Sequence, residues 1–318
     1  MLSGLPVGHP GWTRFLLRWR VAEVTGVAMA SAGKGSAVVW HWRGRDVVVG
    51  TTRLGSGPRA LLLPALSSIS TRAEMAPLAE RLAGRFTTLS IDWPGFGAAP
   101  KPAMAWSPEA LAAFLRFALD EVAQGPALVV AAGHAAGYVI AEAAARPAPG
   151  RRLVLVAPTW RGPLPTMLRR RPAWLGRLAR AADVPGLGSA LYRLNVNPAM
   201  VRVMARAHVY ADPAWLTPER EAAKRGVTGA EGARHAAVRF VTGELDPFRD
   251  RADVLAAAAA LREPALVIYG EDAPPKSRAE MEALAAVPGI AARVLPRGKL
   301  SLHEEFPDAV AGAILDAV

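Results

Sequence analysis

The stretch Pro126-Ala-Leu-Val-Val-Ala-Ala-Gly-His-Ala-Ala-Gly-Tyr-Val-Ile140 decides the fold. Its first part is a short apolar run, typical of a strand that is buried on both faces of a sheet. Its second part continues with apolar residues at helical spacing, which predicts a helix over 138–145. A turn of small residues, Gly133-His134-Ala135-Ala136-Gly137, joins the two. A strand that leads directly into a helix indicates a βαβ unit, and therefore a parallel sheet covered by helices.

The same alternation of strand and helix extends to both sides of this stretch. Strands are expected at 38–42, 47–52, 60–64, 86–91, 128–131 and 153–157, with helices at 71–84 and 108–122 between them. Residues 163–262 have helical character, interrupted by prolines. Strands return at 265–269 and 291–295, each followed by a helix, at 277–286 and 308–317. This order predicts one α/β domain with a helical segment inserted into it.

This pattern divides the chain into three parts. Residues 37–158 and 263–318 form the predicted core, and 159–262 form a helical cap. Residues 1–36 form a basic amphipathic segment. Within it, residues 12–24 place tryptophan, phenylalanine and leucine at helical spacing beside three arginines, a pattern of helices that lie on anionic membranes. Packing of this helix on the body of the domain is the simpler interpretation.

Composition narrows the functional classes. The 318 residues include no cysteine, which excludes disulfides, thiolate metal sites and a cysteine nucleophile. The net charge is +11, and much of it lies in residues 161–206, which hold nine arginines and a single acid, Asp183. Such a field attracts anionic partners: an acidic ligand, an anionic membrane surface or an acidic protein. Nucleic acid is an unlikely partner because no nucleic-acid-binding motif is present.

Cofactor and metal sites are not expected either. The sequence has no phosphate-binding glycine-rich loop and no histidine cluster or metal-ligand spacing. No stretch is long and apolar enough to span a bilayer, and no clear signal peptide is present. The sequence therefore predicts a cytoplasmic protein, with peripheral membrane association as an alternative.

Several motifs identify a family. Asp92-Trp93-Pro94-Gly95-Phe96-Gly97 follows the strand at 86–91, Tyr269-Gly270-Glu271-Asp272 ends the strand at 265–269, and His303-Glu304-Glu305-Phe306-Pro307 precedes the last helix. Together with the turn at 133–137, these motifs in this order resemble the α/β-hydrolase superfamily over residues 37–318. The resemblance implies a doubly wound, mostly parallel sheet of α/β-hydrolase type with an inserted helical cap.

The resemblance also implies three catalytic positions, and none of them carries a reactive side chain. The serine of the family's G-x-S-x-G elbow corresponds to Ala135, the acid to Ala273 and the histidine to Leu300. Alanine cannot form an acyl-enzyme, and leucine cannot transfer a proton. An oxyanion hole formed by the N–H of Ala136 and one from the 65–67 loop needs no side chain, and could persist without a nucleophile.

Other residues could restore chemistry. Asp272 stands one residue before the expected acid and His303 three after the expected histidine, so a register shift could pair them. Ser67, Ser68 and Ser70 follow the strand at 60–64, but a simpler role is to cap the helix near Thr71, with Glu74 completing a capping box. The full candidate pocket set is Ala65, Leu66, Ser67, Ser68, His134, Ala136, Trp160, Arg161, Asp272 and His303.

Within that set, several residues have competing interpretations. Trp160 could stack on a ligand and Arg161 could bind its anionic end, or both could pack the cap on the core. His134 is interpreted as structural and Asp246 as a turn residue of the cap.

Three hypotheses for the function remain open. The first is a non-hydrolytic, ligand-binding or regulatory pseudoenzyme with a basic, apolar-lined cap that holds a small apolar or acidic molecule. The second is an atypical hydrolase or lyase that uses Asp272, His303 and the loop serines. The third is an interaction protein that docks on anionic lipid or on a protein partner.

Overall fold

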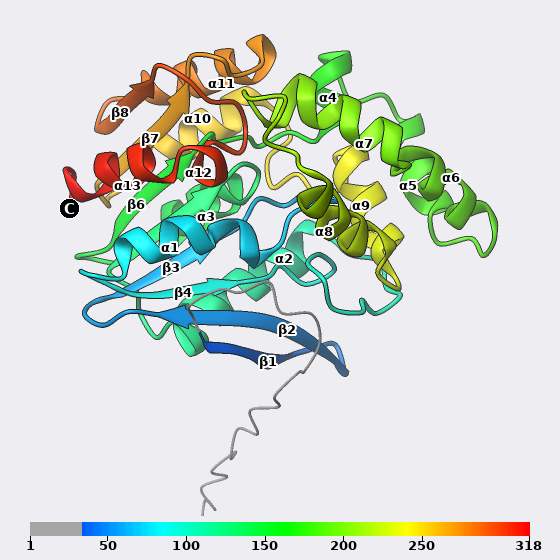
Figure 1. Ribbon diagram of the computed structural model, residues 1–318, viewed down its shortest axis with the longest axis horizontal. Helices are drawn as coiled ribbons and strands as arrows, with labels where there is room; N and C mark the ends of the chain where they lie inside the picture. The colour runs from blue at the N-terminus through cyan, green and yellow to red at the C-terminus, as the bar shows by residue number, and fades with distance from the viewer. Residues whose placement is uncertain (1–33) are drawn as a thin grey trace, which may run out of the picture.

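A single sheet of eight strands forms the centre of the protein in the computed structural model, which describes residues 34–318 (Figure 1). The strands are β1 (Lys34–Trp42), β2 (Arg45–Leu54), β3 (Arg59–Leu63), β4 (Thr87–Ile91), β5 (Leu128–Ala132), β6 (Arg152–Val156), β7 (Ala265–Gly270) and β8 (Ile290–Leu295). Their order across the sheet is β1-β2-β4-β3-β5-β6-β7-β8. β2 runs antiparallel to β1 and β4, and all other neighbours are parallel. The predicted fold class is therefore confirmed.

The elements between the strands begin and end close to the expected positions. They are η1 (Arg72–Met75), α1 (Ala76–Leu82), α2 (Pro108–Phe117), η2 (Ala118–Val122), α3 (Ala135–Ala145), α10 (Arg251–Ala259), α11 (Pro275–Ala285), α12 (Leu302–Glu305) and α13 (Pro307–Leu315). α2 illustrates the local cause: Ser107 caps its N-terminus by accepting a hydrogen bond from the Ala110 N–H, and Pro108 occupies the first helical position.

Helices cover both faces of the sheet. α1 contacts α12 and α13 on one face, while α3 contacts α2 and α10 on the other (Figure 1). The central strands β5 and β7 are buried along their whole length, and β3 and β6 are buried except at their first residues. Burial on both faces explains why these strands are continuous apolar runs without alternation.

The segment between β6 and α10 is a helical insertion. It comprises α4 (Pro163–Leu168), α5 (Trp174–Ala181), α6 (Leu187–Asn195), α7 (Pro198–Met204), η3 (Ala205–Val209), α8 (Pro218–Gly229) and α9 (Ala233–Thr242). Figure 1 shows it beside the carboxyl ends of the central strands. α10, which the sequence assigned to the cap, contacts α3 and therefore packs with the core.

The N-terminal boundary also differs from expectation. β1 begins at Lys34, so the last residues of the segment predicted at 1–36 belong to the sheet. The expected helix at 12–24 lies outside the described residues.

Candidate functional site

The turn between β5 and α3 is sharp, and its left-handed residue is Gly133. Gly133 has φ of 52°, whereas His134 is already helical and Ala135 is the first residue of α3. In an elbow of this kind, the nucleophile stands on the sharp turn between strand and helix. The geometry therefore places the reactive position at Gly133, two residues before the Ala135 that the sequence spacing indicated. Neither residue carries a hydroxyl group.

The surroundings of Gly133 show which way a side chain there would point. A Cβ atom added to Gly133 would lie 3.1 Å from the Cβ of Ala65, in the loop after β3. Position 133 thus faces the loop that was expected to complete an oxyanion hole. A left-handed conformation costs a non-glycine residue about 1–2 kcal/mol, which glycine avoids.

Of the backbone donors expected in that hole, the N–H of Ala136 and that of Ala65 in the 65–67 loop are already engaged. The N–H of Ala136 donates to the carbonyl oxygen of Gly133 at 3.2 Å. The N–H of Ala65 donates to a carboxylate oxygen of Glu74 at 2.7 Å. These two N–H groups therefore do not point at an open site for a substrate oxygen.

A buried ionisable pair lies directly beside the turn. The Nε2 atom of His134 is 3.3 Å from the Oδ1 atom of Asp246, and both side chains are almost fully buried. Asp246 also accepts a hydrogen bond from the Gly162 N–H at 2.9 Å and from the guanidinium of Arg171 at 2.5 Å. Asp246 is thus a junction between the helical insertion and the core, not the simple turn residue that the sequence suggested.

Burial dominates the titration of this pair. It lowers the pKa of His134 to about 4, against a smaller opposing effect of the Leu245 carbonyl. It raises the pKa of Asp246 to about 7, although the nearby Arg171 and the Gly162 N–H favour the ionised form. The pair is therefore best described as a neutral imidazole beside a carboxyl group that is largely protonated below neutral pH.

Side chains of the helical insertion pack against His134 and the first turn of α3. The ring of Phe240, from α9, packs edge-on against His134 with centroids 5.4 Å apart. The hydroxyl of Tyr138 donates to the Leu245 carbonyl at 2.6 Å. A Cβ atom on Gly137 would lie 3.0 Å from the Pro247 ring. The end of the helical insertion thus packs on the first turn of α3, whereas Ala65 alone lies within 4 Å of a Cβ atom built on Gly133.

The two residues proposed to restore an acid–histidine pair are not joined. Asp272 accepts hydrogen bonds from the Arg297 guanidinium at 2.8 Å and from the Gly298 N–H at 3.2 Å. His303 is fully buried, and its Nε2 lies 3.5 Å from the carboxylate of Glu74.

The expectation that Glu74 completes a capping box is wrong. Thr71 caps η1 through the Ala73 N–H, while the Glu74 side chain turns into the core.

The Glu74–His303 pair continues into a cluster of buried polar groups between core and insertion. Lys224 of α8 lies 3.4 Å from Glu304, and Tyr210 donates to the same carboxylate at 2.9 Å. Burial raises the pKa of Glu74, but the hydrogen bond and charge of His303 and the charge of Lys224 outweigh it and keep the pKa low. Burial lowers the pKa of Lys224, but Glu304, Tyr210 and Glu74 reverse this and raise it. The cluster thus sets one buried cation, Lys224, beside the carboxylates of Glu74 and Glu304.

The loop serines do not contact the imidazole of His303. Ser70 donates to Ser67 at 3.0 Å, and Ser67 also accepts from the Ile69 N–H. Ser68 is half-buried. Of the positions that the family pattern assigns to the acid and the histidine, Ala273 is buried and Leu300 is half-buried.

The remaining candidates, Trp160 and Arg161, pack against each other. The Arg161 guanidinium lies 4.3 Å from the centre of the Trp160 ring, which is buried. Leu66 and Ala136 are buried and Ala65 is half-buried.

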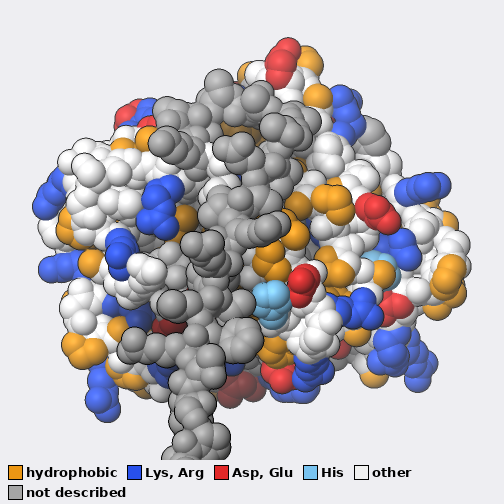
Figure 2. Space-filling model, turned by 90° about the horizontal axis from the view of Figure 1, so that it is seen from below, with side chains coloured by type: hydrophobic (Ala, Val, Ile, Leu, Met, Phe, Trp, Pro, Cys, Tyr) orange, Lys and Arg blue, Asp and Glu red, His pale blue; other side chains and the backbone are white. Residues whose placement is uncertain are grey.

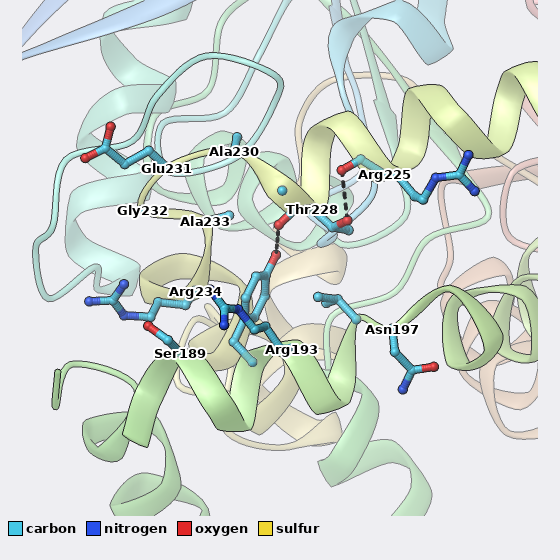
Figure 3. Close-up of a pocket in the computed structure, with 13 residues that line it drawn as sticks. Ser189, Arg193, Asn197, Arg225, Thr228, Ala230, Glu231, Gly232, Ala233 and Arg234 are labelled. Carbon is cyan, nitrogen blue, oxygen red and sulfur yellow. Dashed lines mark hydrogen bonds between the residues drawn. The ribbon is translucent and has the colours of Figure 1, made fainter. Parts of the chain in front are cut away.

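A separate cavity lies within the helical insertion (Figure 3). Its volume is about 520 Å³, and it lies between α6 and the connection from α8 to α9. Arg193, Arg225 and Arg234 contribute positive charge, and Val196 and Ala233 contribute apolar surface. The Arg225 guanidinium is paired with Glu221 at 2.7 Å, and the Nε of Arg234 donates to the Ala182 carbonyl at 3.0 Å. The cavity is therefore lined by both basic and apolar side chains.

Sequence reasoning missed Arg171, Lys224 and the cavity because each depends on contacts between distant segments. The sequence signal for the contact between Arg171 and Asp246 was weak: Asp246 is a charged residue next to apolar ones in Gly-Glu-Leu-Asp-Pro-Phe at 243–248.

Among residues 34–318, no group of three or more histidine, aspartate or glutamate side chains is placed to hold a metal ion. No helix in that range is long and apolar enough to cross a membrane.

The comparisons with known proteins agree with the observed fold. The model of the alpha/beta hydrolase family matches residues 60–313. A probable hydrolytic enzyme from Pseudomonas aeruginosa superposes with a TM-score of 0.68 at 17% identity, covering 91% of this chain and 95% of its own. An enol-lactonase from Burkholderia xenovorans gives a TM-score of 0.63 at 22% identity, covering 85% and 96%.

A haloalkane dehalogenase loop variant from Bradyrhizobium elkanii gives a TM-score of 0.63 at 21% identity, covering 89% of this chain and 96% of its own. No protein of curated function matches the sequence. At these identities the structural likeness establishes the fold alone.

Proposed function

The chain belongs to the alpha/beta hydrolase family, and from that premise we propose that it is a non-hydrolytic member, a ligand-binding or regulatory protein. One observation carries the proposal: the left-handed residue of the elbow is Gly133, and Ala135 occupies the position indicated by the sequence motif. Serine hydrolysis needs an oxygen nucleophile beside a base. Neither position supplies one.

The packing around the elbow supports the same interpretation. Phe240 packs on His134, Tyr138 donates to the Leu245 carbonyl and Arg171 pairs with Asp246, so these contacts fix the helical insertion to the core beside the turn. The nearest ring nitrogen, on His134, belongs to an imidazole whose pKa is lowered to about 4 by burial and which faces a carboxyl group. This histidine acts as a structural link between core and insertion.

Hydrolysis of p-nitrophenyl acetate and butyrate tests the proposal. We expect the purified protein to hydrolyse both esters no faster than its Ser67→Ala/Ser70→Ala variant, because the turn carries no side-chain nucleophile in either protein. A wild-type rate far above that of the variant would contradict the proposal.

A second function is favoured by a specific observation. His303 and Glu74 form a fully buried imidazole–carboxylate pair, the arrangement that a general base requires. An atypical hydrolase or lyase would therefore use Glu74, and not Asp272, to orient His303. The His303→Asn variant separates the two functions. If the wild type shows turnover and this variant does not, the turnover depends on the His303–Glu74 pair.

The ligand of a non-hydrolytic member needs a site, and we assign it to the cavity in the helical insertion. Its apolar walls and arginines suit an acidic molecule with a short apolar chain. Of the three arginines, Arg193 and Arg234 have no carboxylate partner among the described ion pairs. These two guanidinium groups are therefore the candidates for binding a carboxylate.

Octanoate and octanol probe this assignment. A ligand that binds only the folded state raises the melting temperature. We expect octanoate to raise the melting temperature and octanol, which lacks the charge, to have little effect. The Arg193→Gln/Arg234→Gln double variant should lose the response, whereas Arg177→Gln, an exposed arginine of α5, should retain it. Equal responses in the double variant and the wild type would rule out this site.

A further inference from the structure

The most exposed hydrophobic side chains of the described protein are concentrated in the helical insertion. Ten large hydrophobic residues are strongly exposed, and eight of them lie between residues 167 and 203. These eight are Met167, Leu168, Trp174, Val184, Leu187, Leu194, Met200 and Val203. Leu194 and Val203 are 70% and 62% exposed, which is unusual for aliphatic side chains on ordered helices.

The same segment carries a dense positive charge. The exposed arginines interspersed with these hydrophobic residues are Arg169, Arg170, Arg177, Arg180, Arg193 and Arg206, together with Arg202, which is paired with Glu221 of α8 at 2.8 Å. The single acid of the segment, Asp183, is paired with Arg239 at 2.6 Å and with His235 at 2.6 Å. It therefore neutralises little of the outward-facing charge. We call this surface, residues 167–206, the basic apolar face.

The opposite sides of these helices pack against the rest of the protein. α4, α5 and α6 each contact α9, and Figure 1 shows α4 to α7 along the outer edge of the molecule. α5 shows the division most clearly: Leu175 and Ala179 are buried, whereas Trp174 and Arg177 are exposed. In Figure 2, basic and hydrophobic side chains lie next to one another at the end of the molecule where Figure 1 places α5 and α6.

We propose that the basic apolar face docks on a membrane surface rich in anionic phospholipid. Aliphatic and tryptophan side chains distributed between arginines match the headgroup region, where apolar chains insert shallowly and arginines meet phosphates. A second copy of the same face is a poor partner, because it would bring two strongly positive surfaces together. This docking needs no activity at the elbow, and Arg193 is the one arginine that the face shares with the proposed ligand cavity.

Charge makes the association dependent on salt and lipid. Raising the salt concentration from about 0.1 M to about 1 M shortens the Debye length from roughly 10 Å to roughly 3 Å. Binding to vesicles that contain phosphatidylglycerol should therefore weaken steeply with salt, and binding to pure phosphatidylcholine vesicles should be weak throughout.

Sedimentation of the full chain with these two kinds of vesicle tests the proposal. The Arg169→Gln/Arg170→Gln/Arg177→Gln variant should bind phosphatidylglycerol vesicles about a hundredfold more weakly, since each basic residue near the surface contributes roughly 1 kcal/mol. The Leu194→Glu/Val203→Glu variant should lose at least about tenfold. Both variants keep Arg193 and Arg234, so the octanoate response should be unchanged.

The matched control changes the two exposed hydrophobic residues outside this face. Val48 and Val294 are 47% and 42% exposed on strands of the core. The Val48→Glu/Val294→Glu variant should bind vesicles like the wild type. The proposal is overturned if the wild type fails to sediment with phosphatidylglycerol vesicles, if both variants of the basic apolar face bind normally, or if the control loses binding equally. Salt-insensitive sedimentation, or binding to an acidic protein without vesicle binding, would also overturn it.

Discussion

Replacing Lys224 by methionine is expected to lower the free energy of unfolding by about 3–5 kcal/mol. The ammonium group is buried beside Glu304 at 3.4 Å, and its charge also acts on Glu74. Methionine has nearly the same volume, so little packing is lost. What remains is a buried carboxylate of Glu304 without its cation, a situation far more costly than the loss of a surface ion pair.

Chemical unfolding of three variants measures this effect. Lys224→Met should show the full loss, and Lys224→Met/Glu304→Gln should recover part of it because the orphaned charge is gone. Lys276→Met removes an exposed lysine of α11 and should change stability by less than about 1 kcal/mol. A loss for Lys224→Met that is as small as that of Lys276→Met would show that the cluster is open to water.

The His134–Asp246 pair should produce opposite pH dependences in two variants. In the folded state the pKa of Asp246 is raised to about 7. Between about pH 4 and 7 the folded protein therefore keeps a proton on Asp246 that the unfolded chain has released. Its contribution to stability is present below the unfolded pKa near 4 and is lost as pH rises toward 7. For His134, lowered to about 4, stability is present above the unfolded pKa near 6.5 and is lost as pH falls toward 4.

Between about pH 4 and 6.5 the two contributions cancel in the wild type. Relative to the wild type, Asp246→Asn should therefore become more stable by about 4 kcal/mol from pH 4 to 7. His134→Asn should become less stable by about 3 kcal/mol from pH 4 to 6.5, again relative to the wild type. Urea unfolding at several pH values measures both curves.

The pH dependence of the Asp246→Asn variant also shows whether burial or Arg171 controls the ionisation of Asp246. Arg171 lies 2.5 Å from Asp246 and favours its ionised form, whereas burial favours the protonated form. We expect burial to dominate because the Asp246 side chain has no exposed surface. A flat difference curve for Asp246→Asn would mean that Arg171 keeps the carboxylate ionised.

The sheet could be predicted from sequence because its strands are short apolar runs that are buried on both faces. Leu128–Ala132 and Ala265–Gly270 are examples, and the helices between them carry local signals such as the Ser107-Pro108 start of α2. Local patterns of this kind need no knowledge of distant contacts. The order of strands then follows from the family resemblance.

The site was less predictable because small differences in local geometry decide it. The motif spacing placed the reactive residue at Ala135, but α3 begins at that residue and the left-handed turn falls on Gly133. The partner of His303 is Glu74, more than two hundred positions away in the chain. Spacing alone suggested Asp272, which in fact binds Arg297. Long-range packing chooses between such partners, and it leaves no trace in a local pattern.

Incubation with a fluorophosphonate, followed by intact-mass spectrometry, tests the central claim most directly. This reagent phosphonylates an activated serine whatever substrate the enzyme prefers. The account predicts an unmodified mass for the wild type, as for a Ser67→Ala/Ser70→Ala variant. A stoichiometric adduct on the wild type that one serine substitution removes would show that a working nucleophile exists in this protein.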